Sequence, residues 1–281
     1  MNGYLIEKYS NMAGAYTSGR LMEEAKLRNI KLKMLGVEDT VIRDGILHCG
    51  LEELSKVDFI INRYKYGVRK DELNALANRS YNELAGLNRY INKASELMDM
   101  QGLDICLPKY IVAKWQFTYE ELVSILGSPF VVKGLQGSQG NQVYLVKQPK
   151  DYIGLKHQYQ EQEMLFEEFI RESYGHDVRF LMIAGQVTAC MERISKEGFR
   201  SNFALGGTVK SYPIDDRIRE IGAAVYAKTK LDIVGVDLLL GAEDYVFCEI
   251  NVTPGIEGIE LATQVNAAGQ IMDYICETVD K

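Results

Sequence analysis

The sequence lacks the features that define several classes of protein. Its five cysteines form no CxxC pair and its three histidines show no zinc-like spacing, so we expect reduced, mostly buried thiols and no structural zinc. No run of 18 apolar residues occurs, and residues 1–11 lack the basic start and apolar run of a secretory signal. We therefore expect a cytoplasmic protein with no membrane partner.

Positive charge is also scarce. Lysine and arginine number 32 against 39 aspartates and glutamates, which gives a formal net charge of -7. This balance argues against a broad surface for phosphate backbones, and we expect no nucleic-acid partner. The 281 residues, of which 47% are hydrophobic and 25% charged, can bury a core as one large lobe or two to three small ones.

The first 90 residues alternate between strand-like and helix-like patterns. Residues 4–6, 31–35 and 57–62 are short apolar runs, and helical spacing occupies residues 21–28 between the first two. Such alternation favours a parallel sheet with helices on its faces. We therefore predict the α/β fold class, with a first α/β lobe at residues 1–90.

A boundary helix is predicted at residues 91–102. Ala94, Leu97 and Met98 lie on its apolar face, and a glycine ends it. We place a second lobe after this boundary, at residues 91–170.

The second lobe contains a predicted helix at residues 119–126 and two apolar runs at 130–133 and 143–146. The runs flank a glycine-bearing loop at residues 134–140, so we expect two antiparallel strands with a mobile loop between them.

A third lobe is predicted at residues 171–281. Strand hairpins there alternate with a strong amphipathic helix at residues 215–231, and a further helix is expected at 265–279.

The segment VGVDLLLGAEDYVFCEINVTPG, residues 234–255, indicates a hairpin that turns at 242–244. Folding it places Asp237 near the level of Glu249, and Asn251 shares a face with Glu249. Carboxylate and amide oxygens are donors that Mg²⁺ accepts, and an unpaired carboxylate among apolar residues is costly. The alternative is that all three are ordinary polar residues on a solvated sheet face.

Two further patterns indicate anion binding. Lys133 ends an apolar strand before a loop with Gly134, Gly137 and Gly140, whose backbone could approach phosphate oxygens, although a plain turn explains the same glycines. Residues 176–202 form a predicted hairpin that turns near 184–186. Its arginines could clamp phosphate or carboxylate groups, or be simply solvated: Arg179, Arg193 and Arg200.

In this order the patterns resemble the ATP-grasp superfamily, specifically the RimK-like carboxylate–amine ligases. The resemblance covers residues 55–275, and its most specific segments are KEGFRSN at 196–202, GVDLL at 235–239 and EINVTPGIEGIE at 249–260. It implies an ATP-grasp fold with an N-terminal pre-ATP-grasp α/β domain. It also implies ATP and Mg²⁺ as cofactors, with Mn²⁺ as an alternative metal.

The resemblance assigns roles residue by residue. Lys93 and Lys133 would bind the ATP phosphates, and Asp177 would contact ATP. The remaining ATP-binding positions belong to the closing glycine loop, the adenine hinge and the segment that reaches the phosphates: Gly137, Ser138, Gln139 and Gly140; Glu167, Glu168, Phe169 and Ile170; Arg200, Ser201 and Asn202.

The same resemblance places the metal on Asp237, Glu249 and Asn251. Arg193 and Arg200 would be the catalytic residues, stabilising the transferring phosphoryl group and the oxyanion. The positions that would face the substrate are Arg179 and Gly255, the latter in the loop at residues 253–257.

The chain departs from the family pattern at two positions. Gln142 stands where relatives often carry glycine, and Glu167 stands where an amide is common. The first departure would affect loop mobility and the second adenine contacts.

The function implied is amide-bond formation through an acyl phosphate, with ATP, a carboxylate acceptor and an amine donor as partners and glutamate a frequent donor. Two alternatives stay open: a catalytically silent ATP-binding regulatory protein, and a kinase of a small alcohol.

Relatives commonly form dimers or tetramers, so we expect a homo-oligomer. A basic run could form a rim for an acidic acceptor or be a solvated loop: Arg63, Lys65, Arg69 and Lys70.

Overall fold

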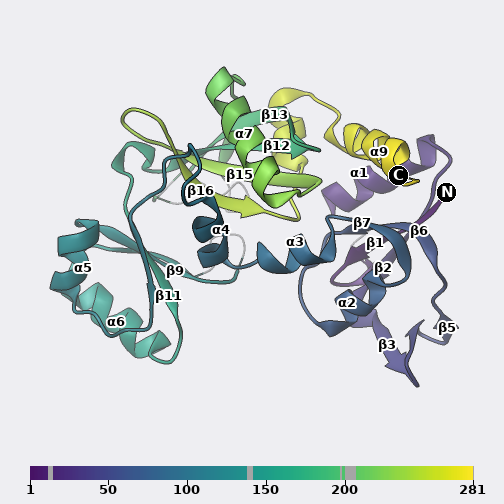
Figure 1. Ribbon diagram of the computed structural model, residues 1–281, viewed down its shortest axis with the longest axis horizontal. Helices are drawn as coiled ribbons and strands as arrows, with labels where there is room; N and C mark the ends of the chain where they lie inside the picture. Colours follow the sequence, from purple (N-terminus) through teal and green to yellow (C-terminus); the bar gives the residue numbers. More distant parts are fainter. Residues whose placement is uncertain (12–14, 138–141, 197, 200–206, 281) are drawn as a thin grey trace.

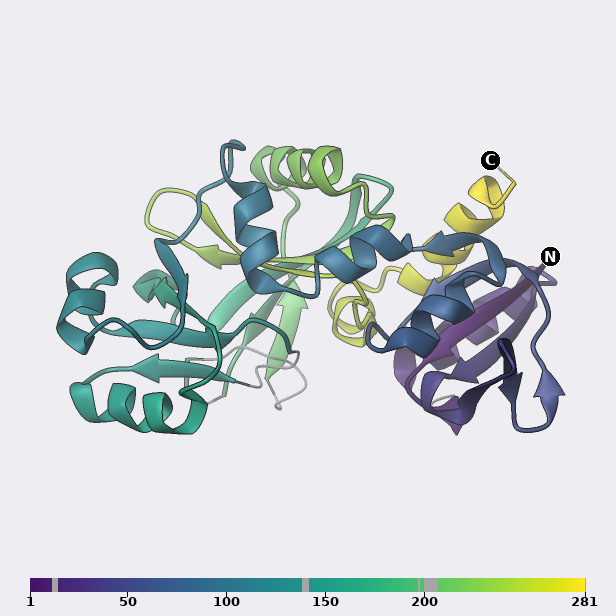
Figure 2. The same cartoon turned by 60° about the horizontal axis from the view of Figure 1, so that its bottom comes forward.

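The computed structural model describes residues 1–11, 15–137, 142–196, 198–199 and 207–280. The first lobe lies at one end of the molecule, the second at the opposite end, and the largest sheet lies between them (Figures 1 and 2). Among these residues, no helix is long and apolar enough to cross a membrane.

The first lobe is built on a parallel sheet, as predicted, and the structure gives it four strands in the order β2-β1-β6-β7. A small antiparallel sheet of β3, β4 and β5, which the sequence analysis did not predict, extends from it. The elements of this lobe are β1 (Asn2–Glu7), α1 (Tyr16–Leu27), β2 (Lys31–Gly36), β3 (Thr40–Arg43), β4 (Ile46–Cys49), β5 (Glu52–Glu53), β6 (Val57–Asn62), α2 (Val68–Asn74) and β7 (Ala77–Tyr81).

Two short helices, α3 (Leu84–Arg89) and α4 (Lys93–Met100), lead out of the first lobe. Asn92 caps α4, because its side chain accepts a hydrogen bond from the backbone N–H of Ala94. The predicted apolar face of this helix is wrong at Met98, which is 62% exposed. The face is instead continued by Glu96 and Met100, which are buried beside Leu97.

The second lobe is an antiparallel sheet in the order β10-β9-β11-β8, with α5 and α6 packed on it. The predicted pairing of β9 with β10 is confirmed, with Lys133 opposite Val143. Helix α5 begins at a capping box of Thr118 and Glu121, which explains its sharp start. The elements are β8 (Tyr110–Ala113), α5 (Tyr119–Leu126), β9 (Phe130–Gly134), β10 (Val143–Val146), α6 (Pro149–Tyr159) and β11 (Met164–Glu168).

The third sheet has the order β14-β13-β12-β15-β16, so the two predicted hairpins are neighbours through β12 and β15. Helix α8, at Glu257–Thr263, follows the second hairpin and was not predicted. The elements are β12 (His176–Ile183), β13 (Gln186–Ile194), β14 (Thr208–Ser211), α7 (Asp216–Thr229), β15 (Ile233–Leu240), β16 (Tyr245–Asn251), α8 and α9 (Ala267–Thr278).

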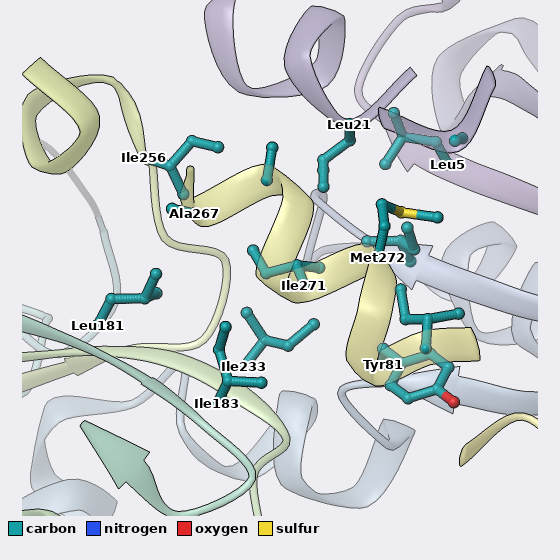
Figure 3. Packing of buried hydrophobic residues seen from close by; sticks show 14 of the residues in the cluster. Leu5, Leu21, Tyr81, Leu181, Ile183, Ile233, Ile256, Ala267, Ile271 and Met272 are labelled. Carbon is teal, nitrogen blue, oxygen red and sulfur yellow. The ribbon is translucent and has the colours of Figure 1, made fainter. Parts of the chain in front are cut away.

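One buried apolar cluster joins the first lobe to the third sheet. Leu21 of α1 and Leu5 of β1 share it with Ile271 and Met272 of α9 and with Ile183 of β12 (Figure 3). The last helix therefore packs between the first lobe and the third sheet. The lobe boundaries near residues 90 and 170 stay a prediction.

Candidate active site

A cleft of about 480 Å³ lies where the three lobes meet. The first lobe contributes Thr17 at the start of α1 and Lys65 after β6, and α4 contributes Lys93. The third sheet contributes Arg193 from β13 and Glu249 from β16. Clefts of this kind, between lobes and with convergent charged groups, are the usual place for small-molecule sites.

The register of the β15–β16 hairpin agrees with the prediction. Asp237 lies directly opposite Glu249, and Gly235 lies opposite Asn251. A register irregularity follows Asp237, between it and Leu238. Glu249 and Asn251 both line the cleft, whereas Asp237 is 1% exposed and is not among the lining residues.

Two arginines and two aspartates form a buried network across β13, β12 and β15. Arg193 donates from Nε and Nη2 to the two oxygens of Asp177, at 2.6 Å each. Its Nη2 also lies 2.6 Å from Oδ2 of Asp237, and Nη2 of Arg179 lies 2.6 Å from the same oxygen. Burial lowers the pKa of Arg193, but Asp237 and Asp177 outweigh burial and raise it above its usual value. The two guanidinium groups are thus fixed beside the cleft.

Lys93 stands at the first position of α4, and its backbone N–H donates to the carbonyl of Leu135 at 2.9 Å. Its Nζ lies 3.2 Å from Oε2 of Glu249. Burial lowers the pKa of Lys93, but Glu249 and Glu96 outweigh burial, so the pKa stands above its usual value. Burial likewise raises the pKa of Glu249, but Lys93 and Arg179 hold it well below its usual value. Both groups are therefore ionised.

Lys133 lies on β9 and forms an ion pair with Glu167 on the neighbouring strand β11. Its Nζ also lies 4.0 Å from the sulfur of Cys248. Burial lowers the pKa of Lys133, while Cys248 and Glu167 raise it above its usual value. The other oxygen of Glu167, Oε1, is buried and has no hydrogen-bond partner among the described residues. Glu167, the hinge residue that departs from the family pattern, thus pairs with Lys133, which is predicted to bind phosphate.

The rest of the predicted hinge, residues 168–170, begins at the last residue of β11. Oε2 of Glu168 accepts a hydrogen bond from the backbone N–H of Lys109 at 3.2 Å. The ring of Phe169 packs edge-on against Tyr174 and Phe199, with centroids 6.1 and 6.3 Å away. Ile170 leads into a short 3-10 turn at residues 171–173.

The remaining predicted positions divide into two groups. Gly137 and Gly255 line the cleft. The others lie outside the described residues: Ser138, Gln139, Gly140, Arg200, Ser201 and Asn202.

Glu96 lines the cleft as well, and the sequence analysis did not single it out. Its side chain is 2% exposed, and its Oε2 accepts the backbone N–H of Ile250 at 2.7 Å. Burial raises the pKa of Glu96 to about 8, against the opposing charge of Lys93. Ile250 lies between two predicted metal ligands, so Glu96 joins the helix that carries Lys93 to the strand that carries those ligands. The sequence did contain a signal for Glu96, because it is a glutamate one turn beyond Lys93 on an apolar helix face.

The predicted basic rim is divided by the fold. Arg63 and Lys65 line the cleft, but Arg69 and Lys70 do not appear among its lining residues. Arg69 pairs with Glu38 at 2.5 Å on the outer side of the lobe, and Lys70 is 1% exposed and pairs with Asp71 at 2.5 Å.

Comparison with known proteins gives three consistent findings. A family model described as "RimK-like ATP-grasp domain" matches residues 91–275. A protein of Teredinibacter turnerae named "Probable alpha-L-glutamate ligase" is 31% identical over 282 residues, with 92% of this chain and 91% of that protein covered. A protein of the same name from Thioalkalivibrio sulfidiphilus is 31% identical over 288 residues, with 95% and 93% covered.

Solved structures of ATP-grasp proteins share the fold along nearly the whole chain. A RimK domain protein of Sphaerobacter thermophilus has a TM-score of 0.75 at 16% identity, covering 98% of this chain and 99% of that one. The D-alanine–D-alanine ligase of Bacillus anthracis complexed with ATP has a TM-score of 0.74 at 15% identity, with 99% and 97% covered. The ATP-grasp ligase PsnB complexed with a minimal precursor, Mg and ADP has a TM-score of 0.73 at 13% identity, with 99% and 98% covered.

Proposed function

The chain belongs to the RimK-like ATP-grasp family and is an ATP-dependent C–N ligase, and from this premise we propose that it joins an amino acid such as glutamate to a carboxylate acceptor. The amino-acid part of the proposal is supported by the two relatives named as probable alpha-L-glutamate ligases. The observation that carries the proposal is the convergence of Lys93, Arg179 and Arg193 with Glu249 and Asn251 on one cleft.

The reaction begins when an oxygen of the acceptor carboxylate attacks the γ-phosphorus of ATP. The bond from that phosphorus to ADP breaks, which gives an acyl phosphate and ADP. The amine then attacks the acyl carbon, phosphate leaves, and a phosphate oxygen takes the proton that the amine loses. Little covalent chemistry falls to the protein, so positioning and charge stabilisation are its main tasks.

The cations of the cleft have separate roles in this scheme. Lys93 and Lys133 neutralise the phosphates of ATP from two sides, since one lies on α4 and the other on β9. Arg193 is fixed by Asp177 and Asp237 and faces the charge that develops on the transferring phosphoryl group and on the oxyanion, a role shared with Arg200, which lies outside the described residues. Arg179, paired with Asp237, faces the substrate. A guanidinium that is already held in place needs no reorganisation when this charge appears.

The donor set fits Mg²⁺, with Mn²⁺ as an alternative. Asp237, Glu249 and Asn251 offer hard oxygen donors on paired strands, and Mg²⁺ takes few protein ligands and completes its shell with water and phosphate oxygens. Glu249 is held ionised, as a ligand must be. A bound Mg²⁺ would supply charge neutralisation on the phosphates. The carboxylates of Asp237 and Glu249 lie next to Arg179 and Lys93, respectively.

The test is an incubation with Mg-ATP, pools of amino acids and candidate carboxylate acceptors, followed by ADP release and product mass. A mass gain equal to the amine minus water supports the ligase. A phosphate ester would indicate the small-molecule kinase, and tight ATP binding without turnover across broad pools would favour the silent ATP-binding protein.

A matched pair of variants ties the activity to the cleft. Lys93→Gln removes a charge at the predicted phosphate site and should lower kcat by about 100-fold or more. Lys26→Gln makes the same change on the exposed side of α1 and should leave the rate unaltered. Equal rates in the two variants would contradict the assignment of Lys93.

We also propose a homo-oligomer, a dimer or tetramer, as is common in the family. Light scattering during gel filtration measures this directly, and a monomer at micromolar concentration would contradict it.

A further inference from the structure

The segment Arg63–Tyr66 follows the carboxyl end of β6 and runs along the cleft before α2 begins at Val68. In open parallel sheets, ligands bind outside the carboxyl ends of the strands. Thr17, at the start of α1, lies on the same wall of the cleft. The partial positive charge at this helix end adds to the cations of the segment.

Arg63 is well buried but incompletely satisfied. Its Nη1 donates to the carbonyl of Pro254, in the loop predicted to face the substrate. Its Nε lies 3.5 Å from Oε1 of Glu7 and has no hydrogen-bond partner among the described residues. Burial lowers the pKa of Arg63, with Glu7 opposing. The guanidinium is therefore held beside the cleft between Glu7 and the carbonyl of Pro254.

Lys65 is a cation of the cleft for which the described part of the chain provides no ion pair. Lys93, Arg179 and Arg193 all have carboxylate partners. The Nζ of Lys65 instead lies 5.9 Å from the ring centroid of Tyr66. Burial and the nearby charge of Lys93 lower the pKa of Lys65, with Glu249 and Glu96 opposing. A partly buried cation without a counter-ion is costly unless a ligand supplies the charge.

We propose that Arg63 and Lys65 form a carboxylate subsite on the first-lobe wall of the cleft, which binds a substrate carboxylate that takes no part in the reaction. This inference rests on the proposed function, because it assigns one substrate group to the ligase cleft. Arginine and lysine are the side chains that bind carboxylates with charge-assisted hydrogen bonds. The predicted phosphate lysines lie on α4 and β9, whereas Arg63 and Lys65 follow β6 on the first-lobe wall.

The carboxylate has two possible sources with the same chemistry. It is either the side chain of an acidic amine donor or an acidic group of the acceptor. The subsite makes the enzyme selective for charge at a position away from the reacting centre, whichever source applies.

The test compares charged and amide forms of the same ligand on the wild type and on Lys65→Gln. The donor arm measures binding of L-glutamate against L-glutamine by calorimetry with ADP and Mg²⁺ present, so that no turnover occurs. The acceptor arm measures a peptide of three glutamates against its glutamine counterpart under the same conditions. The KM values of the same pairs are then measured with ATP.

In either the donor arm or the acceptor arm, the wild type should bind the acidic ligand about tenfold more tightly than its amide, as expected for one charge-assisted contact. Lys65→Gln should abolish that preference. Lys65→Arg should retain it. Lys56→Gln, the same change at an exposed lysine of the same lobe, should also retain it. The arm that responds identifies the source of the carboxylate.

Equal binding of acid and amide by the wild type in both arms would overturn the subsite, as would an unchanged preference in Lys65→Gln. If no ligand combination supports ADP release but the charge preference depends on Lys65, the ligase proposal fails and the subsite stands. The two proposals are thus separable.

Discussion

Glu96 is expected to make the stability of the free protein fall as pH rises. Its carboxyl is 2% exposed, and burial raises its pKa from 4.5 to about 8, with Lys93 opposing. Between those values the folded chain holds a proton that the unfolded chain has lost. The free energy of unfolding therefore decreases through this window, by up to about 1.4 kcal/mol per pH unit and about 5 kcal/mol in all.

Glu96→Gln removes the titration but keeps an oxygen that can accept the backbone N–H of Ile250. The variant and the wild type should be about equally stable near pH 4.5, and the variant should be more stable by about 4 kcal/mol at pH 8. Glu96→Ala, which leaves that N–H unpaired, should lose about 1–3 kcal/mol near pH 4.5.

Urea unfolding at a series of pH values in EDTA measures these differences. Glu120→Gln is the matched control, because Glu120 is exposed on α5 and its replacement should not change the pH dependence. Parallel stability curves for Glu96→Gln and the wild type would refute the reasoning, since they would mean that Glu96 ionises normally in the folded chain.

Three further substitutions test the site. Asp237→Asn breaks the buried pairs with both arginines of the network and should destabilise the chain by about 3–5 kcal/mol; an unchanged urea midpoint would contradict this. Glu167→Gln removes the carboxylate that competes with phosphate for Lys133 and should tighten binding of a non-hydrolysable ATP analogue by about tenfold in calorimetry. Weaker binding would mean that Glu167 contacts the nucleotide. Gln142→Gly relieves a φ of 56° and should raise stability by about 0.5–1 kcal/mol in thermal unfolding, whereas a loss would show that the side chain contributes more than its backbone costs.

Local patterns were sufficient for much of the fold. Strand period and a polar turn predicted the β15–β16 hairpin with the pairing of Asp237 and Glu249, because both signals lie within one short segment. Helix α5 was predicted with its observed bounds, and the structure adds a capping box of Thr118 and Glu121 at its start. The predicted parallel sheet of the first lobe is confirmed for the same reason, because β1, β2 and β6 each carry an apolar run; β7, with the sequence ANRSY, carries none and was not predicted.

Partners across lobes could not be predicted in the same way. The pairing of Lys133 with Glu167 depends on the order of strands in the second sheet, which no local pattern encodes. Arginine side chains are usually solvated, and this was an open alternative for Arg179 and Arg193. In the structure both arginines form ion pairs with aspartates on neighbouring strands. Glu96 was overlooked because its partner is a backbone N–H far along the chain. The sequence thus indicated well which side chains are chemically suited to the site. It indicated less well which groups each of these side chains contacts.

The position of α9 affects the order in which the chain can fold during synthesis. Leu21 and Ala25 of α1 belong to the same buried cluster as Ile271 and Met272 of α9 (Figure 3). On a ribosome the strands and helices of the first lobe emerge first, and lobes generally fold in that order. Here, however, α9, which lies far downstream of the first lobe, supplies part of the core around α1. That core therefore stays incomplete until α9 has been synthesised.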